Sequence, residues 1–248
     1  MAGSGLVAAV RILTVVPLPG PEPQRRAAAV PWFGVVGLGI GGVLYGCARW
    51  VYPLLPQSLP FTGLCMTAGY YALTGMLHLD GLADTADAFG TRHTRERTLE
   101  ILKDPHIGVF GTASLVLVLL WRVLLFETLC ARGAGVWCVY MVVLSRIGQG
   151  LLLALLPYAR GASGKAHGLK GTRGTVVLLI GELSVVAGCM NVFHGGALTA
   201  VACVAAVVAA ALPVYAAVRR LGGITGDILG AATELFECVL LAVVVFGS

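Results

Sequence analysis

Long apolar segments alternate with short polar ones along most of the chain. Seven of the apolar segments are about twenty residues long with few charges, enough to cross a hydrocarbon core of about 30 Å as a helix. They are approximately 31–52, 60–79, 109–130, 135–157, 175–193, 197–218 and 228–247. The pattern predicts an all-α fold, a polytopic integral membrane bundle of about seven transmembrane helices.

The composition agrees with this pattern. Of the 248 residues, 58% are hydrophobic and only 12% are charged, with a mean hydropathy of +0.89. Soluble domains have roughly a quarter of their residues charged, so the composition excludes an ordinary soluble fold. No internal repeat covers the chain, and we expect residues 1–248 to form a single membrane-embedded domain.

A glycine-rich stretch, residues 37–42, lies inside the first predicted span. A nucleotide-binding loop of this composition would need a strand before it and a helix opening after it, and the sequence predicts neither. Small residues let membrane helices approach closely. The stretch therefore predicts a close helix contact.

The positions of the 17 Lys and Arg residues predict how the bundle is oriented. With the N-terminus assigned to the cytoplasm, all but four of them fall in cytoplasmic segments, as the positive-inside rule requires. The four are Arg49, Arg122, Arg132 and Arg146, of which only Arg132 lies in a predicted outer loop. The net charge of +5 is explained by this rule and by anionic lipid, so it does not indicate nucleic-acid binding.

An acid-rich segment follows the second predicted span. Asp80, Asp84 and Asp87 are spaced i, i+4, i+7, so on a helix their carboxylates lie on one face. A carboxylate in a membrane costs about 2.5–3.5 kcal/mol at a helix centre, and three together repel one another. Mg²⁺ would offset both penalties and still leave coordination positions for substrate phosphates. The simpler interpretation, capping of a helix end or pairing with the following arginines, needs one aspartate rather than three in register.

Further charged residues lie at the same predicted level of the membrane. Asp104 and Asp227 are candidates to complete the site as metal ligands or as a general base, and Lys103 adjoins the first of them. Arg suits phosphate binding through its bidentate fork and Lys through its point charge. The basic candidates are Arg92, Arg95, Arg97, Lys103, Arg160, Lys165 and Lys170. Topology explains each one alone, but together with the acids they indicate an anionic, phosphorylated substrate.

Two acids of the last span, Glu234 and Glu237, have two open roles. They could pair with Arg122 or Arg146 inside the bundle, since ions within a membrane usually find partners, or they could serve the substrate. The histidines form no pair at metal-binding spacing, and we expect them at solvated or interfacial positions. They are His78, His93, His106, His167 and His194.

Three motifs occur in order along the chain: HLDGLADTAD at 78–87, RERTLEILKD at 95–104, and LGGITGDILGAA at 221–232 followed by Glu234 and Glu237. Two further segments, residues 13–19 and 32–37, also contribute to the resemblance described next. With these motifs the chain resembles the cobalamin synthase family, adenosylcobinamide-GDP ribazoletransferase. The family often has Gly at the position of Ala88 and Ser at that of Pro105, and neither difference removes a charge.

The resemblance implies a multi-pass enzyme of the cell inner membrane that requires Mg²⁺ and acts on the cytoplasmic side. Its substrates would be adenosylcobinamide-GDP and α-ribazole, or α-ribazole 5′-phosphate in the same role, and GMP would be released. Asp80, Asp84 and Asp87 are then the expected metal ligands. The expected catalytic residues are Lys103, Asp104 and Asp227, with Arg92, Arg95, Arg97, Arg160 and Lys165 at the substrate phosphates.

Two other functions fit the sequence less well. A CDP-alcohol phosphotransferase that makes phospholipid needs Asp-x-x-Asp-Gly and two more aspartates downstream, whereas here Asp87 is followed by Ala88 and Phe89. A transporter would place its acids near the membrane midplane, whereas these acids lie beside the arginine-rich loops. The sequence leaves the oligomeric state, the lower base of the product and the phosphorylation state of the acceptor open.

Overall fold

The computed structural model describes residues 2–21, 23–55, 60–160, 166 and 168–247, and within these residues the chain is helical with no strand. Six helical segments are long and apolar enough to cross a membrane. They are Arg26–Leu54 (η1 Arg26–Trp32, α2 Phe33–Gly46, η2 Cys47–Val51 and η3 Tyr52–Leu54), α6 Val109–Ala131, α7 Trp137–Leu155, α8 Arg173–His194, α9 Ala197–Leu221 and α10 Gly226–Gly247. The predicted all-α, multi-pass membrane fold is confirmed.

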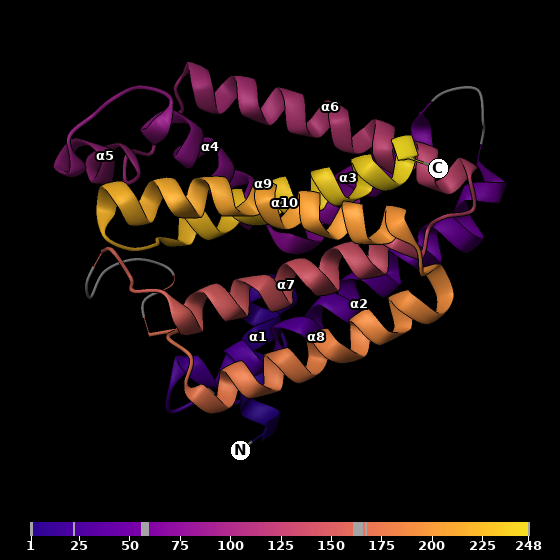
Figure 1. The fold of residues 1–248 in the computed structure, drawn as a ribbon, viewed down its shortest axis with the longest axis horizontal. Helices are drawn as coiled ribbons and strands as arrows, with labels where there is room; N and C mark the ends of the chain where they lie inside the picture. Colours follow the sequence, from indigo (N-terminus) through magenta and orange to yellow (C-terminus); the bar gives the residue numbers. More distant parts are fainter. Residues whose placement is uncertain (1, 22, 56–59, 161–165, 167, 248) are drawn as a thin grey trace.

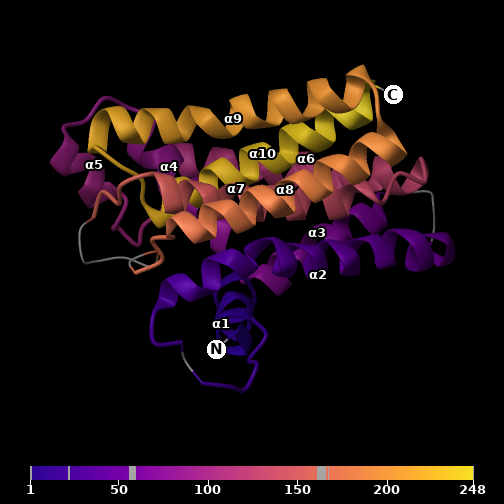
Figure 2. The ribbon, with the colours of Figure 1, turned by 60° about the horizontal axis from the view of Figure 1, so that its bottom comes forward.

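The long helices lie side by side in one bundle that has two distinct ends (Figure 1). One end carries α5 (Arg95–Ile101) and the α9–α10 connection, and we call it the α5 end. The opposite end carries the α6–α7 and α8–α9 connections and the C-terminus, and we call it the C-terminal end. Helix α1 (Ala2–Leu13) and the segment after it project from one side of the bundle (Figure 2).

The predicted span 60–79 is not one continuous helix. Helix α3 (Phe61–Thr74) ends at Gly75, which has a left-handed φ of 61°, and after Met76, with φ 55°, the chain enters α4 (Leu77–Phe89). Gly75 allows the break because glycine adopts left-handed angles without steric cost. The 14 residues of α3 span only about 21 Å, less than the hydrocarbon core. The acid-rich segment therefore lies on a helix of its own, and in the part of the chain that the structure describes six helical segments, rather than about seven, are long enough to cross the membrane.

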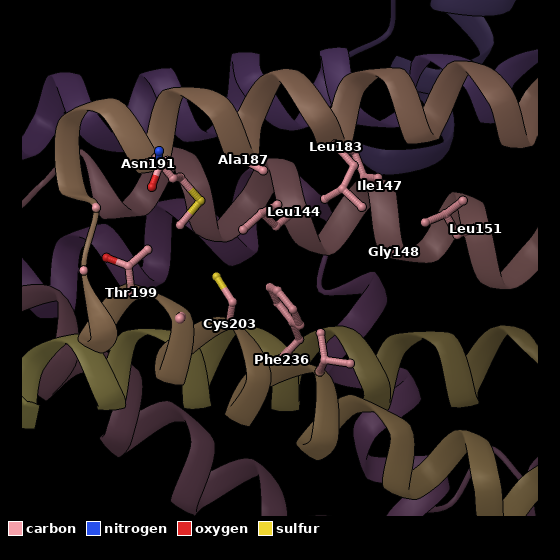
Figure 3. Close-up of a pocket in the computed structure, with 15 residues that line it drawn as sticks. Leu144, Ile147, Gly148, Leu151, Leu183, Ala187, Asn191, Thr199, Cys203 and Phe236 are labelled. Atoms are coloured by element: carbon pink, nitrogen blue, oxygen red, sulfur yellow. The ribbon is translucent and has the colours of Figure 1, made fainter.

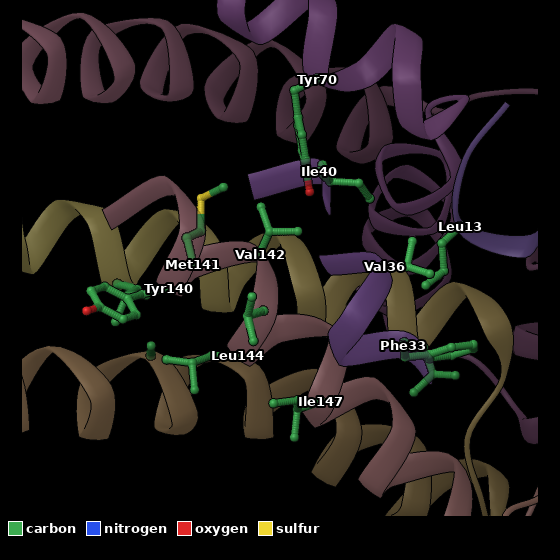
Figure 4. Close-up of a cluster of buried hydrophobic side chains, with 14 of the residues drawn as sticks. Leu13, Phe33, Val36, Ile40, Tyr70, Tyr140, Met141, Val142, Leu144 and Ile147 are labelled. Carbon is green, nitrogen blue, oxygen red and sulfur yellow. The ribbon is translucent and has the colours of Figure 1, made fainter. Parts of the chain in front are cut away.

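The predicted close contact through residues 37–42 is present between α2 and α7. A Cβ atom on Gly37 would lie 3.0 Å from the carbonyl oxygen of Val142, and one on Gly41 would lie 2.7 Å from the Cα of Val139. Glycine at these two positions lets the two backbones meet. Large apolar side chains of α2, α3 and α7 fill the core around this contact (Figure 4).

Four fully buried charged side chains lie near the middle of α6, α7 and α10, and we call them the buried ion cluster: Arg122, Arg146, Glu234 and Glu237. Arg122 lies 2.6 Å from Glu234 and 3.0 Å from Glu237, and Arg146 lies 3.1 Å from Glu237. The hydroxyl of Tyr70 donates to Glu237 at 2.8 Å. Of the two roles left open for the glutamates, pairing inside the bundle is therefore the one observed.

Candidate active site

Two glycines bring α4 and α10 into backbone contact. A Cβ on Gly81 would lie 2.7 Å from the carbonyl oxygen of Asp227, and one on Gly230 would lie 2.9 Å from that of His78. No larger residue fits at this crossing without a shift of the backbone. As a result, the first turn of α4, with Asp80, lies beside the first turn of α10, with Asp227. Helix N-termini favour carboxylates because their free N–H groups and dipole are positive.

A pocket of about 280 Å³ lies at this crossing, and we call it the acidic pocket. Asp80 and Asp227 line it together with two arginines of the N-terminal segment, Arg11 and Arg26. The remaining wall is largely apolar and includes Leu13, Phe33 and Leu153. Apolar walls with a few convergent polar groups are typical of a small-molecule site.

Asp227 is held in place by Arg160, one of the predicted phosphate-binding residues. The guanidinium Nη2 lies 2.7 Å from Oδ2 of Asp227, and the two side chains are only 9% and 12% exposed. The same Nη2 donates to the carbonyl oxygen of Leu102, directly after α5, at 2.6 Å. Arg160 therefore joins the acidic pocket to the end of α5.

Asp87 contacts the start of α6. Its Oδ2 accepts from the backbone N–H of Gly108 at 2.7 Å, and its Oδ1 accepts from that of Gly111 at 2.8 Å. These are N–H groups of a helix N-terminus, which lack partners within the helix. Asp87 thus has the capping role that the simpler interpretation allowed for one aspartate. Asp84 lies half-buried between Asp80 and Asp87 on α4, and metal binding by either Asp84 or Asp87 stays a prediction.

The number of carboxylates in the acidic pocket bears on whether the pocket can bind Mg²⁺. Among the described residues, no three His, Cys, Asp or Glu side chains are grouped so that they could hold a metal ion by themselves. Mg²⁺ at phosphate-transfer sites is usually bound by one or two carboxylates, and water and substrate phosphates complete its shell. Asp80 and Asp227 supply such a pair in one pocket. These residues fit a magnesium ion that binds together with a phosphorylated substrate.

Asp104 and Lys103 are exposed in the segment after α5 and do not line the acidic pocket. Oδ1 of Asp104 accepts from the backbone N–H of His106 at 3.0 Å and lies 2.7 Å from Nδ1 of the same residue. The backbone hydrogen bond, and after it the imidazole, lower the pKa of the Asp104 carboxyl. A carboxylate with a lowered pKa accepts protons weakly, which favours a role as a fixed charge over that of a general base.

The other predicted phosphate-binding residues are spread over the α5 end. Arg92 is exposed, Nε of Arg95 donates to the carbonyl oxygen of Leu221 at 3.2 Å, and Arg97 forms an exposed ion pair with Glu100 at 3.0 Å. Lys165 lies outside the described residues. Arg160 is the described member of this predicted set for which a contact with an acid of the pocket is seen.

Four polar residues line the acidic pocket although the sequence did not predict them as site residues: Arg11, Arg26, His78 and Gln149. His78 is only 3% exposed and Gln149 only 6%, so the expectation of a solvated or interfacial His78 was wrong. In the sequence, the positive-inside rule alone accounts for the two arginines. The available signals were that Arg11 is the one charge in an apolar segment and that His78 opens the first motif.

The sequence is similar to those of known proteins. The family model described as cobalamin-5-phosphate synthase matches residues 5–245. The adenosylcobinamide-GDP ribazoletransferase of Chlorobium phaeovibrioides is 37% identical over 94% of each chain, and that of Ectopseudomonas mendocina is 38% identical over 94% of this chain and 95% of its own. No solved structure matches the chain. Since the family model covers nearly all of the sequence, the chain belongs to the cobalamin-5-phosphate synthase family.

Proposed function

We propose that this protein transfers the adenosylcobinamide phosphate group of adenosylcobinamide-GDP to a free ribose hydroxyl of α-ribazole, or to the same hydroxyl of α-ribazole 5′-phosphate. GMP is released, and adenosylcobalamin or its 5′-phosphate is formed. The family and the names of its relatives support this reaction. The structural observation that carries the proposal is that Asp80 and Asp227, from distant parts of the chain, line one pocket beside two guanidinium groups.

The reaction makes one phosphorus–oxygen bond and breaks another. The acceptor oxygen attacks the phosphorus that bears the cobinamide, the bridging oxygen leaves with GMP, and the hydroxyl proton passes to a base. Positioning and charge stabilisation supply most of the catalysis in such transfers. Bound Mg²⁺ supplies neutralisation of the diphosphate and of the negative charge on the leaving group.

The residues of the acidic pocket and of α4 have separate proposed roles. Asp80 and Asp227 are the proposed metal-holding pair of the acidic pocket, and Asp84 and Asp87 of α4 are further candidate ligands. Arg11 and Arg26 line the same pocket, where their positive charges can stabilise phosphate oxygens. Nε and Nη2 of Arg11 donate to the backbone carbonyl oxygen of Leu18, which holds this guanidinium in place. The part of the substrate that extends beyond the acidic pocket is proposed to contact the charged residues of the α5 end. These are Arg92, Arg95, Arg97, Lys103, Asp104 and Lys165.

We place this site on the cytoplasmic side of the inner membrane. The proposed location follows from the positive-inside rule, because the basic residues predicted to be cytoplasmic include those of the α5 end and of the acidic pocket. The substrates are large, polar and charged, so they would reach the enzyme from water rather than from lipid.

The test is to incubate the purified protein with adenosylcobinamide-GDP, α-ribazole and Mg²⁺ and to measure GMP and adenosylcobalamin. We expect the two products in equal amounts, none after chelation of the metal, and recovery when Mg²⁺ is added back. A protein that forms both products at full rate in excess chelator would contradict the proposed metal.

Single substitutions test the carboxylates. Asp80→Asn and Asp84→Asn should each lower the rate about 100-fold or more, the scale seen when a group that stabilises transition-state charge is removed. Glu96→Gln, at an exposed acid of α5, is the matched control and should leave the rate unchanged. A folded, membrane-inserted Asp84→Asn protein with near-normal turnover would refute its assignment as a ligand.

A further inference from the structure

Helices α8 and α9 follow one another through a short turn but lie apart along their length (Figures 1 and 2). A groove of about 490 Å³ lies between them and is closed from behind by α7 and α10 (Figure 3). Its walls are almost entirely apolar and include Leu144, Leu183, Val207 and Phe236. We call it the α8–α9 groove.

A second pocket continues the α8–α9 groove toward the C-terminal end. The two cavities share Gly195, Gly196 and Thr199, and the second has a volume of about 540 Å³. It is lined by Arg132, directly after α6, and by Trp137, the first residue of α7. These residues lie at helix ends, the level at which lipid headgroups and belts of tryptophan and tyrosine are found.

Arg132 is the one basic residue that the positive-inside rule places in an outer loop, so topology does not explain it. Its guanidinium donates to the backbone carbonyl of Val245, which anchors it at the wall of the second pocket. A guanidinium carries five N–H donors in a planar fork and binds phosphate through two of them at once. The second pocket therefore offers a phosphate-binding group at the mouth of an apolar groove.

We propose that the α8–α9 groove and the pocket beside it bind one phospholipid from the leaflet at the C-terminal end. The headgroup phosphate lies at Arg132 and Trp137, and one acyl chain lies between α8 and α9. The size of the groove favours this occupant over a transmembrane helix of another protein. A helix with its side chains is about 10–12 Å across, so 490 Å³ would hold roughly one turn of it.

Native mass spectrometry of the full-length protein in detergent tests the site, with palmitoyl-oleoyl phosphatidylglycerol as the probe. Diacylglycerol with the same acyl chains is the second probe, because it lacks the phosphate. We expect one tightly bound phosphatidylglycerol, and diacylglycerol bound about tenfold more weakly, since a hydrogen bond to a charged group is lost.

Two variants address the two halves of the site, each with a matched control. Arg132→Gln should weaken phosphatidylglycerol binding about tenfold and leave diacylglycerol binding unchanged. Ala200→Trp fills the α8–α9 groove and should weaken the binding of both lipids. The controls are Arg49→Gln, an exposed arginine at the same end of the bundle, and Val201→Trp, an exposed neighbour that does not line the groove. Both should bind lipid as the wild type does.

Several results would overturn the proposal. Unchanged binding in Arg132→Gln or Ala200→Trp would do so, as would a wild-type protein that holds no phosphatidylglycerol. Equal losses in the controls would indicate surface lipid without a defined site. Loss of a dimer in Ala200→Trp, with lipid binding unchanged, would assign the groove to a second copy of the chain. If Ala200→Trp does not fold, Ala187→Trp blocks the same groove from α8.

Discussion

Asp80, Asp84 and Asp87 share one face of α4, but their surroundings differ from residue to residue. Helical spacing predicted the shared face, because it depends only on positions within one helix. It could not predict that the N-terminus of α6 lies beside Asp87, or that Asp227 lies beside Asp80, because both depend on contacts between distant segments. The same limit explains Arg11 and Arg26, whose place in the acidic pocket has no signature in local spacing.

The contact between Asp87 and α6 leads to a prediction about stability. Asp87→Ala removes the acceptor for two backbone N–H groups and should lower the free energy of unfolding by about 1–2 kcal/mol, the usual cost of losing a helix cap. Asp104→Ala is the control, because that exposed acid contacts only nearby residues, and it should change stability by less than about 0.5 kcal/mol. Denaturation followed by circular dichroism in mild detergent measures both. Equal stability of the two variants would contradict the capping role.

Between elements, the crossing of α4 and α10 decides where the two acids of the pocket lie. The sequence predicted a span over 60–79, which ends in the first turn of α4, and α10 as the last span, but the glycines that join α4 and α10 lie far apart in the chain. Hydropathy over a window of residues does not register a left-handed pair such as Gly75 and Met76, and so the predicted span runs from α3 into the first turn of α4. The close contact through residues 37–42 could be predicted because its glycines are clustered in sequence.

Gly81→Ala tests this crossing. The added methyl group would lie 2.7 Å from the carbonyl oxygen of Asp227, so α4 and α10 must separate and the geometry between Asp80 and Asp227 must change. We expect the rate of GMP release to fall at least about tenfold, because small displacements of catalytic groups are costly. Gly39→Ala is the control, since no atom lies within 4 Å of its Cβ position, and it should keep full activity. Normal turnover in Gly81→Ala would show that the pocket does not depend on the crossing.

In the molecule as a whole, the buried ion cluster links four helices around one neutral centre. Arg122 comes from α6, Arg146 from α7 and both glutamates from α10, while the Tyr70 hydroxyl joins α3 to the same group. The sequence indicated that these charges needed partners, because charges in a membrane are expensive. Which arginine meets which glutamate depends on the packing of helices, and the one-dimensional pattern does not contain that information.

Arg122→Met should therefore be one of the more destabilising single changes in the protein. It leaves Glu234 buried without its guanidinium, and breaking a buried pair from one side costs about 3–5 kcal/mol. The double variant Arg122→Met with Glu234→Gln should recover part of this loss, because no charge is then left unbalanced at that position. Unfolding midpoints in detergent report the coupling, with Arg219→Met at an exposed arginine as the control. Additive losses in the double variant would contradict the pairing.

The same four charges bear on how the protein is assembled during synthesis. A helix with two ionised carboxylates near its centre enters lipid poorly on its own, at a cost of about 2.5–3.5 kcal/mol for each charge. Helix α10 is synthesised after α6 and α7, so the helices that carry both guanidinium groups are already made when its glutamates emerge. We therefore expect the integration of α10 to depend on the placement of the earlier helices, and with it the contact of α10 with α4 at the acidic pocket.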